Sequence, residues 1–271
     1  MTVSAKEVQE LRKMSGAGMM ECKSALSDSG GDITQAFKLL REKGIAKAEK
    51  KSGRDANEGL VGLRVKSGQA SIIEVNSETD FVSRNSEFHD LVNSILDISL
   101  NESDIKLEEN QEVVDLINNA VGKIGENIVL RRSINIKGNI YSYVHNSVSE
   151  GLGKIGVLLD IDSDEGNHDE FGKNICMHIA ALNPKSISDK DLPQEFIDVE
   201  KEIIKKQLKD SGKPNDILEK MMEGKLRKFL EENTLLGQKF VIDPSISIKQ
   251  YIEQYKSSIS INKFIRYEIG S

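Results

Sequence analysis

The sequence contains no tryptophan, and aromatic residues make up only 5% of its 271 positions. Proteins that bind single-stranded nucleic acid stack the bases on aromatic side chains, so this chain offers few such platforms. Acidic residues also outnumber basic ones, 44 to 37, which gives a formal net charge of −7 at pH 7. A net negative chain repels phosphate backbones, and we therefore expect no direct nucleic-acid partner.

Cysteines and long apolar runs are scarce as well. Cys22 and Cys176 lie far apart, so they cannot form a disulfide framework, and we expect both thiols to be reduced. No run approaches the roughly 20 apolar residues that span a bilayer. The first residues lack the basic and apolar regions of a secretory signal. These absences predict a cytoplasmic protein with no membrane partner.

Helical periodicity dominates residues 1–54. Apolar stripes are separated by glycine-containing breaks at 15–18 and 29–31, and Gly44 is expected to end the third helix. Three short helices bury little surface, so this module is expected to be marginally stable alone. The basic stretch that follows, at 47–54, is interpreted as a solvated linker, with an RNA contact as the alternative.

From Gly59 the apolar spacing changes to the alternation that is typical of strands. A first α+β subdomain is predicted at 55–139, with a hairpin of strands 60–65 and 70–75 followed by helices at 88–96 and 113–124 and a strand at 128–136. A second subdomain at 140–271 weakly repeats this order, with strands at 140–145, 155–161 and 261–269 and a helix at 171–182. The strands 128–136 and 140–145 are expected to meet at Gly138-Asn139.

Residues 194–232 interrupt the second subdomain with two charged helical stripes, which are separated by Ser211-Gly212-Lys213-Pro214. Glycine favours the end of a helix and proline the start of the next, so these residues predict an antiparallel helical hairpin. Its apolar stripes either cover each other or present a surface to a partner. The predicted fold class is α+β: a three-helix N-terminal module, two related subdomains with small antiparallel sheets, and this inserted hairpin.

No segment offers a convincing active site. The three glycines of 151–156 have the spacing of a dinucleotide-binding loop, but a strand follows them where a helix is required, so we interpret them as a flexible hairpin loop. The acidic segment 160–166 resembles a calcium loop, yet its glycine is one position late and Phe171 replaces the bidentate glutamate. Cys176 and His178 diverge at i, i+2 on a helix. We therefore expect no catalytic residue, no metal site, no cofactor and no enzymatic activity.

Two segments each allow a structural and a functional interpretation. Ser77 and Asp80 have the spacing of a capping box, in which Asp80 would cap a helix and Phe81 would enter the core. The alternative is an exposed acid–aromatic tip that inserts into a partner. Met19 and Met20 follow a glycine-containing loop at a helix start, where methionines are usually buried. An exposed pair would instead form an adaptable contact surface.

The same two segments carry a family resemblance. Residues 11–26, LRKMSGAGMMECKSAL, and 74–82, EVNSETDFV, closely resemble the two signatures of bacterial translation elongation factor Ts. The similarity continues in order along the chain, through residues 123–127, 176–180, 211–214, 237–241 and 264–268. Ser15 and Glu21 stand where the family more often has Thr and Asp, and the 146–153 loop is longer than the family's short turn.

The resemblance implies a guanine nucleotide exchange factor that binds elongation factor Tu, in its GDP-bound and nucleotide-free states, and whose N-terminal module is similar to ubiquitin-associated domains. The positions that match the family's partner-binding residues are Arg12, Met19, Met20, Thr79, Asp80, Phe81, Val82, Ile124, Gly125 and His145. The first three would contact the partner's nucleotide-binding domain, and Asp80 and Phe81 would form an intruding tip near its magnesium and phosphate region. The last three would add contacts from the two subdomains.

Without the resemblance, the runner-up interpretation is an adaptor or scaffold protein. Its two helical docking surfaces would be the N-terminal module and the helical hairpin. Such a protein would bind a partner without changing the partner's nucleotide kinetics. The sequence leaves open whether the chain also forms a homodimer.

Overall fold

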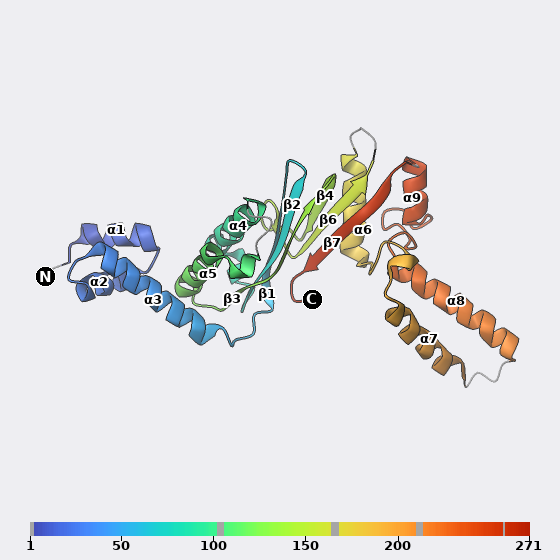
Figure 1. The fold of residues 1–271 in the computed structure, drawn as a ribbon, viewed down its shortest axis with the longest axis horizontal. Helices are drawn as coiled ribbons and strands as arrows, with labels where there is room; N and C mark the ends of the chain where they lie inside the picture. The colour runs from blue at the N-terminus through green and yellow to red at the C-terminus, as the bar shows by residue number, and fades with distance from the viewer. Residues whose placement is uncertain (1–2, 102–105, 164–167, 210–213, 257) are drawn as a thin grey trace. The chain divides into compact units, whose positions relative to one another are not determined.

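The computed structural model describes residues 3–101, 106–163, 168–209, 214–256 and 258–271. The chain divides into two compact units, and their elements are labelled in Figure 1. The first unit holds the residues up to Ile136 together with 146–156 and 267–271, and the second holds 137–145 and 157–266. Both units combine helices with a small sheet, which confirms the predicted α+β class. The three-part division at residues 54 and 139 stays a prediction.

The first unit begins with three helices: α1 (Ala5–Ser15), α2 (Met19–Asp28) and α3 (Ile33–Lys51). Local chemistry sets their starts, since the Ser4 hydroxyl caps α1 and the Asp32 carboxylate accepts the Gln35 N–H at the start of α3. Side chains from all three helices form one buried cluster, which contains Val8, Leu11, Cys22, Ala25, Leu26 and Ala36. The predicted three-helix module is therefore confirmed.

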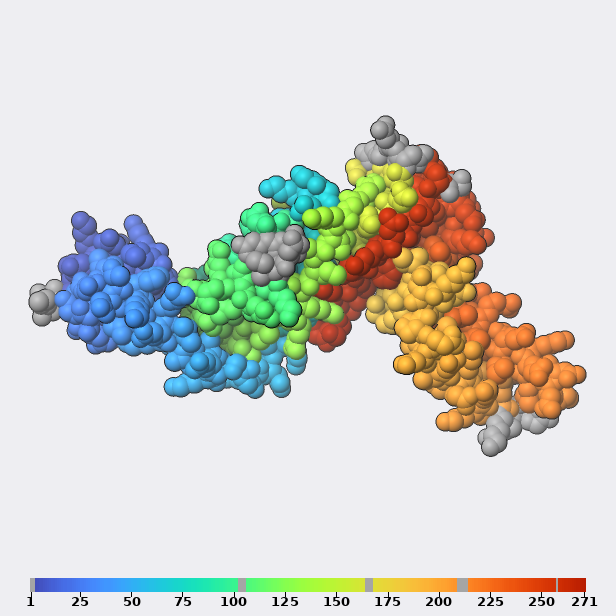
Figure 2. All heavy atoms as spheres, viewed as in Figure 1, coloured from blue at the N-terminus to red at the C-terminus, as the bar shows by residue number. Residues whose placement is uncertain are grey.

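Helix α3 is longer than predicted, and the expectation that Gly44 ends it is wrong. The helix continues to Lys51, so most of the stretch interpreted as a linker is helical. A Cβ atom added at Gly44 would lie 3.8 Å from the carbonyl oxygen of Asn118 on α5 (Gln111–Ile124). This spacing is ordinary van der Waals contact and would admit an alanine methyl, so Gly44 is an interior residue of α3 that faces α5 and does not end the helix. Figure 2 shows that α3 and α5 contact each other.

The sheet of the first unit has the strand order β3-β2-β1-β5. Its strands are β1 (Glu58–Lys66), β2 (Gln69–Ser77), β3 (Ile128–Lys137) and β5 (Leu152–Gly153). The predicted hairpin is confirmed, because β1 and β2 pair antiparallel with Leu60 opposite Val75. Helix α4 (Ser86–Asn101) packs on this hairpin and against α5, and Phe88 and Val92 on α4 are fully buried. This core fixes the end of β2, which leads directly into the candidate site.

The prediction of a flexible hairpin loop at 151–156 is wrong in one respect. Leu152 and Gly153 form the short strand β5, which pairs antiparallel with β1 through Gly62 opposite Leu152. The Leu152 side chain is fully buried in the core of the first unit. Burial of this leucine, which the three-glycine spacing does not reveal, draws the segment onto the sheet. A strand does follow these glycines, as predicted.

The sheet of the second unit has the order β4-β6-β7, with β4 (Ile140–His145), β6 (Ile155–Asp162) and β7 (Ser260–Glu268). Helix α6 (Asp169–Leu182) packs on β4. These elements confirm the strands and the helix that the alternating and helical patterns predicted here. Because β3 and β4 belong to different sheets, Gly138-Asn139 connects two sheets and does not close a hairpin within one.

The predicted helical hairpin is confirmed by α7 (Gln194–Lys209) and α8 (Asn215–Asn233), whose Phe196 and Phe229 rings lie 5.2 Å apart. The predicted break at 211–213 and the end of the acidic segment at 164–166 lie outside the described residues. Helix α9 was not predicted, and neither were two short 3-10 helices. Their bounds are α9 (Ile248–Tyr255), η2 (Leu107–Glu109) and η3 (Asp189–Asp191).

A histidine is fully buried in the second unit. His178 Nδ1 accepts the Val241 N–H at 3.2 Å, and Nε2 lies 3.0 Å from Gln238 Oε1. Because Nδ1 accepts a hydrogen bond, the proton is on Nε2, which donates to Gln238, and the imidazole is neutral. Burial lowers the pKa of His178 below its ordinary value of 6.5, since desolvation of the charged ring outweighs the opposing hydrogen bond to Gln238.

We predict that the second unit loses stability as the pH falls below about 6.5, where an unfolded histidine takes up a proton that buried His178 resists. The free energy of unfolding should be independent of this group above that pH, because the ring is then neutral in both states. His178→Gln keeps one acceptor and one donor but cannot titrate. Urea unfolding at about pH 7.5 and about pH 5.5 should therefore show a larger acid-induced loss in the wild type than in the variant. Equal losses would contradict the assignment.

Candidate protein-interaction site

The segment that follows β2 forms a tip, Thr79–Val82, which carries the exposed Phe81 ring and leads into the 3-10 helix η1 (Val82–Arg84). Phe81 is 78% exposed, more than any other large hydrophobic side chain in the described parts of the chain, whereas Val82 is only 5% exposed. Leaving a phenyl ring in water forgoes roughly 1.5–3 kcal/mol of burial. The Phe81 ring therefore adds nothing to the core of its own chain.

The structure contradicts the interpretation in which Asp80 caps a helix and Phe81 enters the core. The Ser77 hydroxyl donates to the Thr79 carbonyl oxygen at 3.1 Å, so it does not cap a helix through Asp80. The first helical turn, η1, begins at Val82 and not directly after Ser77 as the capping-box spacing implied, and Val82 takes the buried position. The exposed acid–aromatic tip is thus confirmed, while its insertion into a partner stays a prediction.

Glu126 contacts the base of the tip. Its carboxylate accepts two hydrogen bonds from Thr79, one from the backbone N–H at 2.9 Å and one from the hydroxyl at 2.7 Å. Glu126 directly follows Gly125, whose left-handed φ of 86° ends α5. Glu126 was not among the site residues predicted from the sequence. An acid placed immediately after a helix-ending glycine was the signal that could have identified it.

Residues Gly125–Asn127, the post-α5 turn, are held from two sides. Glu78, just before the tip, accepts the Asn127 N–H at 2.6 Å, and this bond is the main reason that its pKa lies below the ordinary value. From the other side, Asn127 donates through its side chain to the Arg54 carbonyl oxygen at 2.7 Å, and the Lys51 ammonium donates to the Gly125 carbonyl oxygen. The end of α3 and the start of the tip therefore meet at one turn.

Met19 and Met20 begin α2 and are 59% and 73% exposed. Gly16 ends α1 in the left-handed conformation, and its N–H donates to the Arg12 carbonyl oxygen at 2.8 Å. The buried position falls instead on Cys22, which is fully enclosed. The expectation that methionines at a helix start are buried is wrong here, and the alternative of an exposed pair is confirmed. The Arg12 side chain is exposed as well.

The remaining predicted residues lie in both units. Ile124 is half-buried against the core of the first unit, and Gly125 is exposed. His145 ends β4 in the second unit, where its exposed ring lies 3.2 Å from the Tyr143 hydroxyl. In the first unit the C-terminal end of α5 contacts both predicted segments: the Lys123 side chain lies against Gly16, and Glu126 bonds to the tip.

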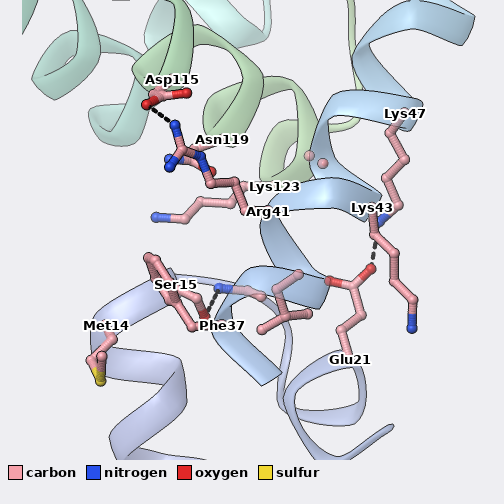
Figure 3. Close-up of a pocket in the computed structure, with 14 residues that line it drawn as sticks. Met14, Ser15, Glu21, Phe37, Arg41, Lys43, Lys47, Asp115, Asn119 and Lys123 are labelled. Atoms are coloured by element: carbon pink, nitrogen blue, oxygen red, sulfur yellow. Dashed lines mark hydrogen bonds and ion pairs between the residues drawn. The ribbon is translucent and has the colours of Figure 1, made fainter. Parts of the chain in front are cut away.

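A pocket of about 170 Å³ lies between the N-terminal helices and α5 (Figure 3). The charged residues in its lining are Glu21, Arg41, Lys43, Lys47, Asp115 and Lys123. Arg41 reaches across to Asp115, and Lys47 pairs with Glu21. The Arg41 bond lowers the pKa of Asp115 and keeps this carboxylate ionised. These ion pairs join α3 to α5 and α3 to α2.

Within the described residues, no group of three or more His, Cys, Asp or Glu side chains is placed to hold a metal ion. None of the helices in the same residues is long and apolar enough to cross a membrane. Cys22 and Cys176 are buried free thiols. Burial raises the pKa of Cys176, so this thiol stays protonated and is a poor nucleophile.

Comparisons with known proteins identify the family of this chain. The family model described as "Elongation factor TS" matches residues 78–271. Elongation factor Ts of Paracoccus denitrificans is 44% identical over 277 residues, a match that covers 100% of this chain and 93% of the relative. The proteins of the same name from Bartonella tribocorum and Roseobacter denitrificans are 43% and 42% identical, each over 100% of this chain and over 94% and 93% of their own lengths. The chain therefore belongs to the elongation factor Ts family.

Proposed function

We propose that this protein is a guanine nucleotide exchange factor that binds elongation factor Tu in the cytoplasm and accelerates the release of GDP from it. The observation that carries the proposal is the tip, where an aromatic ring that is 78% exposed follows an acidic residue at the end of a core strand. Membership of a translation elongation factor family supports the choice of partner.

Nucleotide exchange requires no catalytic residue. The bound factor must weaken the partner's affinity for GDP, and linkage requires that GDP weakens the partner's affinity for the factor by the same ratio. Each tenfold loss of affinity corresponds to about 1.4 kcal/mol of coupling free energy. The protein therefore needs one surface that binds the partner in any nucleotide state and another that fits only the distorted nucleotide site.

The first surface, in this proposal, is the exposed set Arg12, Met19 and Met20 on the N-terminal helices. Methionine side chains are flexible and polarizable, so they adapt to the shape of an apolar partner surface. Arg12 would add a cation to this surface. Ile124, Gly125 and the exposed His145 would extend the contact from the two units.

The second surface is the tip. The Phe81 ring would insert between helices of the partner and displace the groups that hold Mg²⁺ and the phosphates of GDP. Because the ring is already exposed in the free protein, insertion requires no unpacking of this chain's own core. Burial of the ring in the partner gains roughly 1.5–3 kcal/mol, which offsets part of the cost of distorting the nucleotide site. Loss of Mg²⁺ then uncovers phosphate charge and speeds the release of GDP.

The adaptor alternative rests on exposed apolar side chains of α7, where Val199 is 61% and Ile203 is 42% exposed. An adaptor would bind elongation factor Tu, or another protein, without changing the rate at which GDP leaves. Nucleotide kinetics therefore separate the two functions, whereas binding alone does not.

We predict that Phe81→Ala lowers the maximal rate of GDP release from elongation factor Tu by about tenfold or more, because the variant loses a ring worth roughly 1.5–3 kcal/mol. Stopped-flow release of a fluorescent GDP analogue at saturating factor measures this rate. Val65→Ala, which trims an exposed apolar side chain on β1, serves as the control and should leave the rate unchanged. Unchanged acceleration by Phe81→Ala, with intact binding, would exclude insertion of the ring as the mechanism.

We predict the opposite pattern for Met20→Ala. Removing an exposed contact side chain should raise the factor concentration that gives half-maximal GDP release by about five- to tenfold and leave the maximal rate nearly unchanged. Met14→Ala is the matched control, since Met14 is also exposed, at 55%, but lies outside the proposed contact set. A titration in which Met20→Ala lowers only the maximal rate would assign this side chain to distortion of the nucleotide site.

A further inference from the structure

Resting on the proposed exchange function, we propose that Glu126 is a positioning residue for the tip and that the post-α5 turn is the seat on which the tip is held. The chemistry at this seat is specific. Thr79 offers two donors, its N–H and its hydroxyl, and the Glu126 carboxylate accepts one with each oxygen, at 2.9 and 2.7 Å. Two bonds to one carboxylate fix the orientation of Thr79 as well as its position.

Within residues 79–82 themselves, the other side-chain bonds are local. The Ser77 hydroxyl donates to the Thr79 carbonyl oxygen, the Ser83 hydroxyl donates to the Asp80 carbonyl oxygen at 2.6 Å, and Arg84 pairs with the Asp80 carboxylate at 3.2 Å. Such bonds shape the tip but cannot set its direction relative to the sheet. The bonds to Glu126 join it to a residue 47 positions away in the sequence.

Hydrogen bonds from several elements hold the post-α5 turn in place. Gly125 donates its N–H to the Val121 carbonyl oxygen at 3.0 Å, which makes it continuous with α5. Lys51 and Arg54, at and just beyond the end of α3, bond to Gly125 and Asn127. Glu78, which directly precedes the tip, accepts the Asn127 N–H and so connects the chain before the tip to the same turn. The tip is thus connected through Glu126 to both α5 and α3.

A fixed base matters for the step that the tip performs. An inserted side chain can displace groups of the partner only if its own backbone stays in place. A mobile tip would also lose conformational entropy on insertion, which lowers the free energy gained by binding. Glu126 therefore acts through Thr79 on the distortion of the nucleotide site. Glu126 lies outside the proposed binding surface of Arg12, Met19 and Met20. Its removal should therefore lower the maximal rate of GDP release and leave the initial binding of the partner unchanged.

The test combines Glu126→Gln, Thr79→Val and the double variant in the full chain. Glu126→Gln replaces the charged carboxylate with a neutral amide that has a single acceptor oxygen, which weakens the bonds to Thr79, and Thr79→Val replaces the hydroxyl with a methyl group. Each single variant should lower the maximal rate of GDP release about three- to tenfold and change the half-saturating concentration less than about twofold. Because both act through one contact, the double variant should be no slower than the worse single variant.

A second readout needs no partner. The Thr79 amide is hydrogen-bonded to Glu126, so its hydrogen exchange should be at least about fivefold faster in Glu126→Gln. Glu112→Gln, which makes the same charge change at the exposed start of α5, is the control and should leave it unchanged. Circular dichroism checks the fold of each variant, and Thr79→Val, at a partly exposed site, provides the kinetic test should Glu126→Gln fail to fold.

The outcomes separate this inference from the proposed function. A wild-type protein that leaves GDP release unchanged would overturn the proposed function. Wild-type acceleration that Phe81→Ala abolishes, but that Glu126→Gln and Thr79→Val both leave intact, would overturn the positioning role alone. Additive losses in the double variant, or unchanged exchange of the Thr79 amide in Glu126→Gln, would also overturn it.

Discussion

An aromatic ring held in water on a fixed backbone is the constraint around which the first unit is organised. Phe81 stays exposed because its neighbour Val82 is buried in its place, and because the bonds from Thr79 to Glu126 hold the chain that carries it. The core beneath, with Phe88 and Val92 fully buried, supports β2 up to the residue where the tip begins. Val82, which contributes to the core, and Phe81, whose ring stays exposed, are therefore adjacent residues.

The N-terminal helices are attached to α5, the helix that precedes Glu126. Arg41 on α3 pairs with Asp115 on α5, and Lys51 bonds to Gly125 at the end of α5. The loop that precedes the exposed methionines contacts the same helix, since the Lys123 side chain lies against Gly16. Within the first unit, the proposed anchoring surface and the proposed distorting surface therefore rest on one helix. A factor that must bind and distort at once benefits from such a common support, because neither surface can yield independently.

Periodicity predicted most of the elements but not the contacts between them. The hairpin of β1 and β2, the three N-terminal helices and α7–α8 all follow from apolar spacing and breakers. Gly44 was wrongly predicted to end α3, because a glycine at the end of a helix and a glycine inside a helix look alike in a single sequence. The position of Phe81 could not be decided from spacing, since a shift of one residue exchanges it with Val82. Glu126 was missed because its partner Thr79 is distant in sequence.

In the proposed exchange function, this protein and GDP destabilise each other's binding to elongation factor Tu. The most direct measurement is the dissociation constant of the protein for elongation factor Tu, determined by calorimetry without nucleotide and again with GDP bound. A nucleotide exchange factor must show weaker binding to elongation factor Tu when GDP is bound. The ratio must equal that by which the protein weakens the affinity of elongation factor Tu for GDP. A dissociation constant that is the same with and without GDP would contradict it and would favour an adaptor.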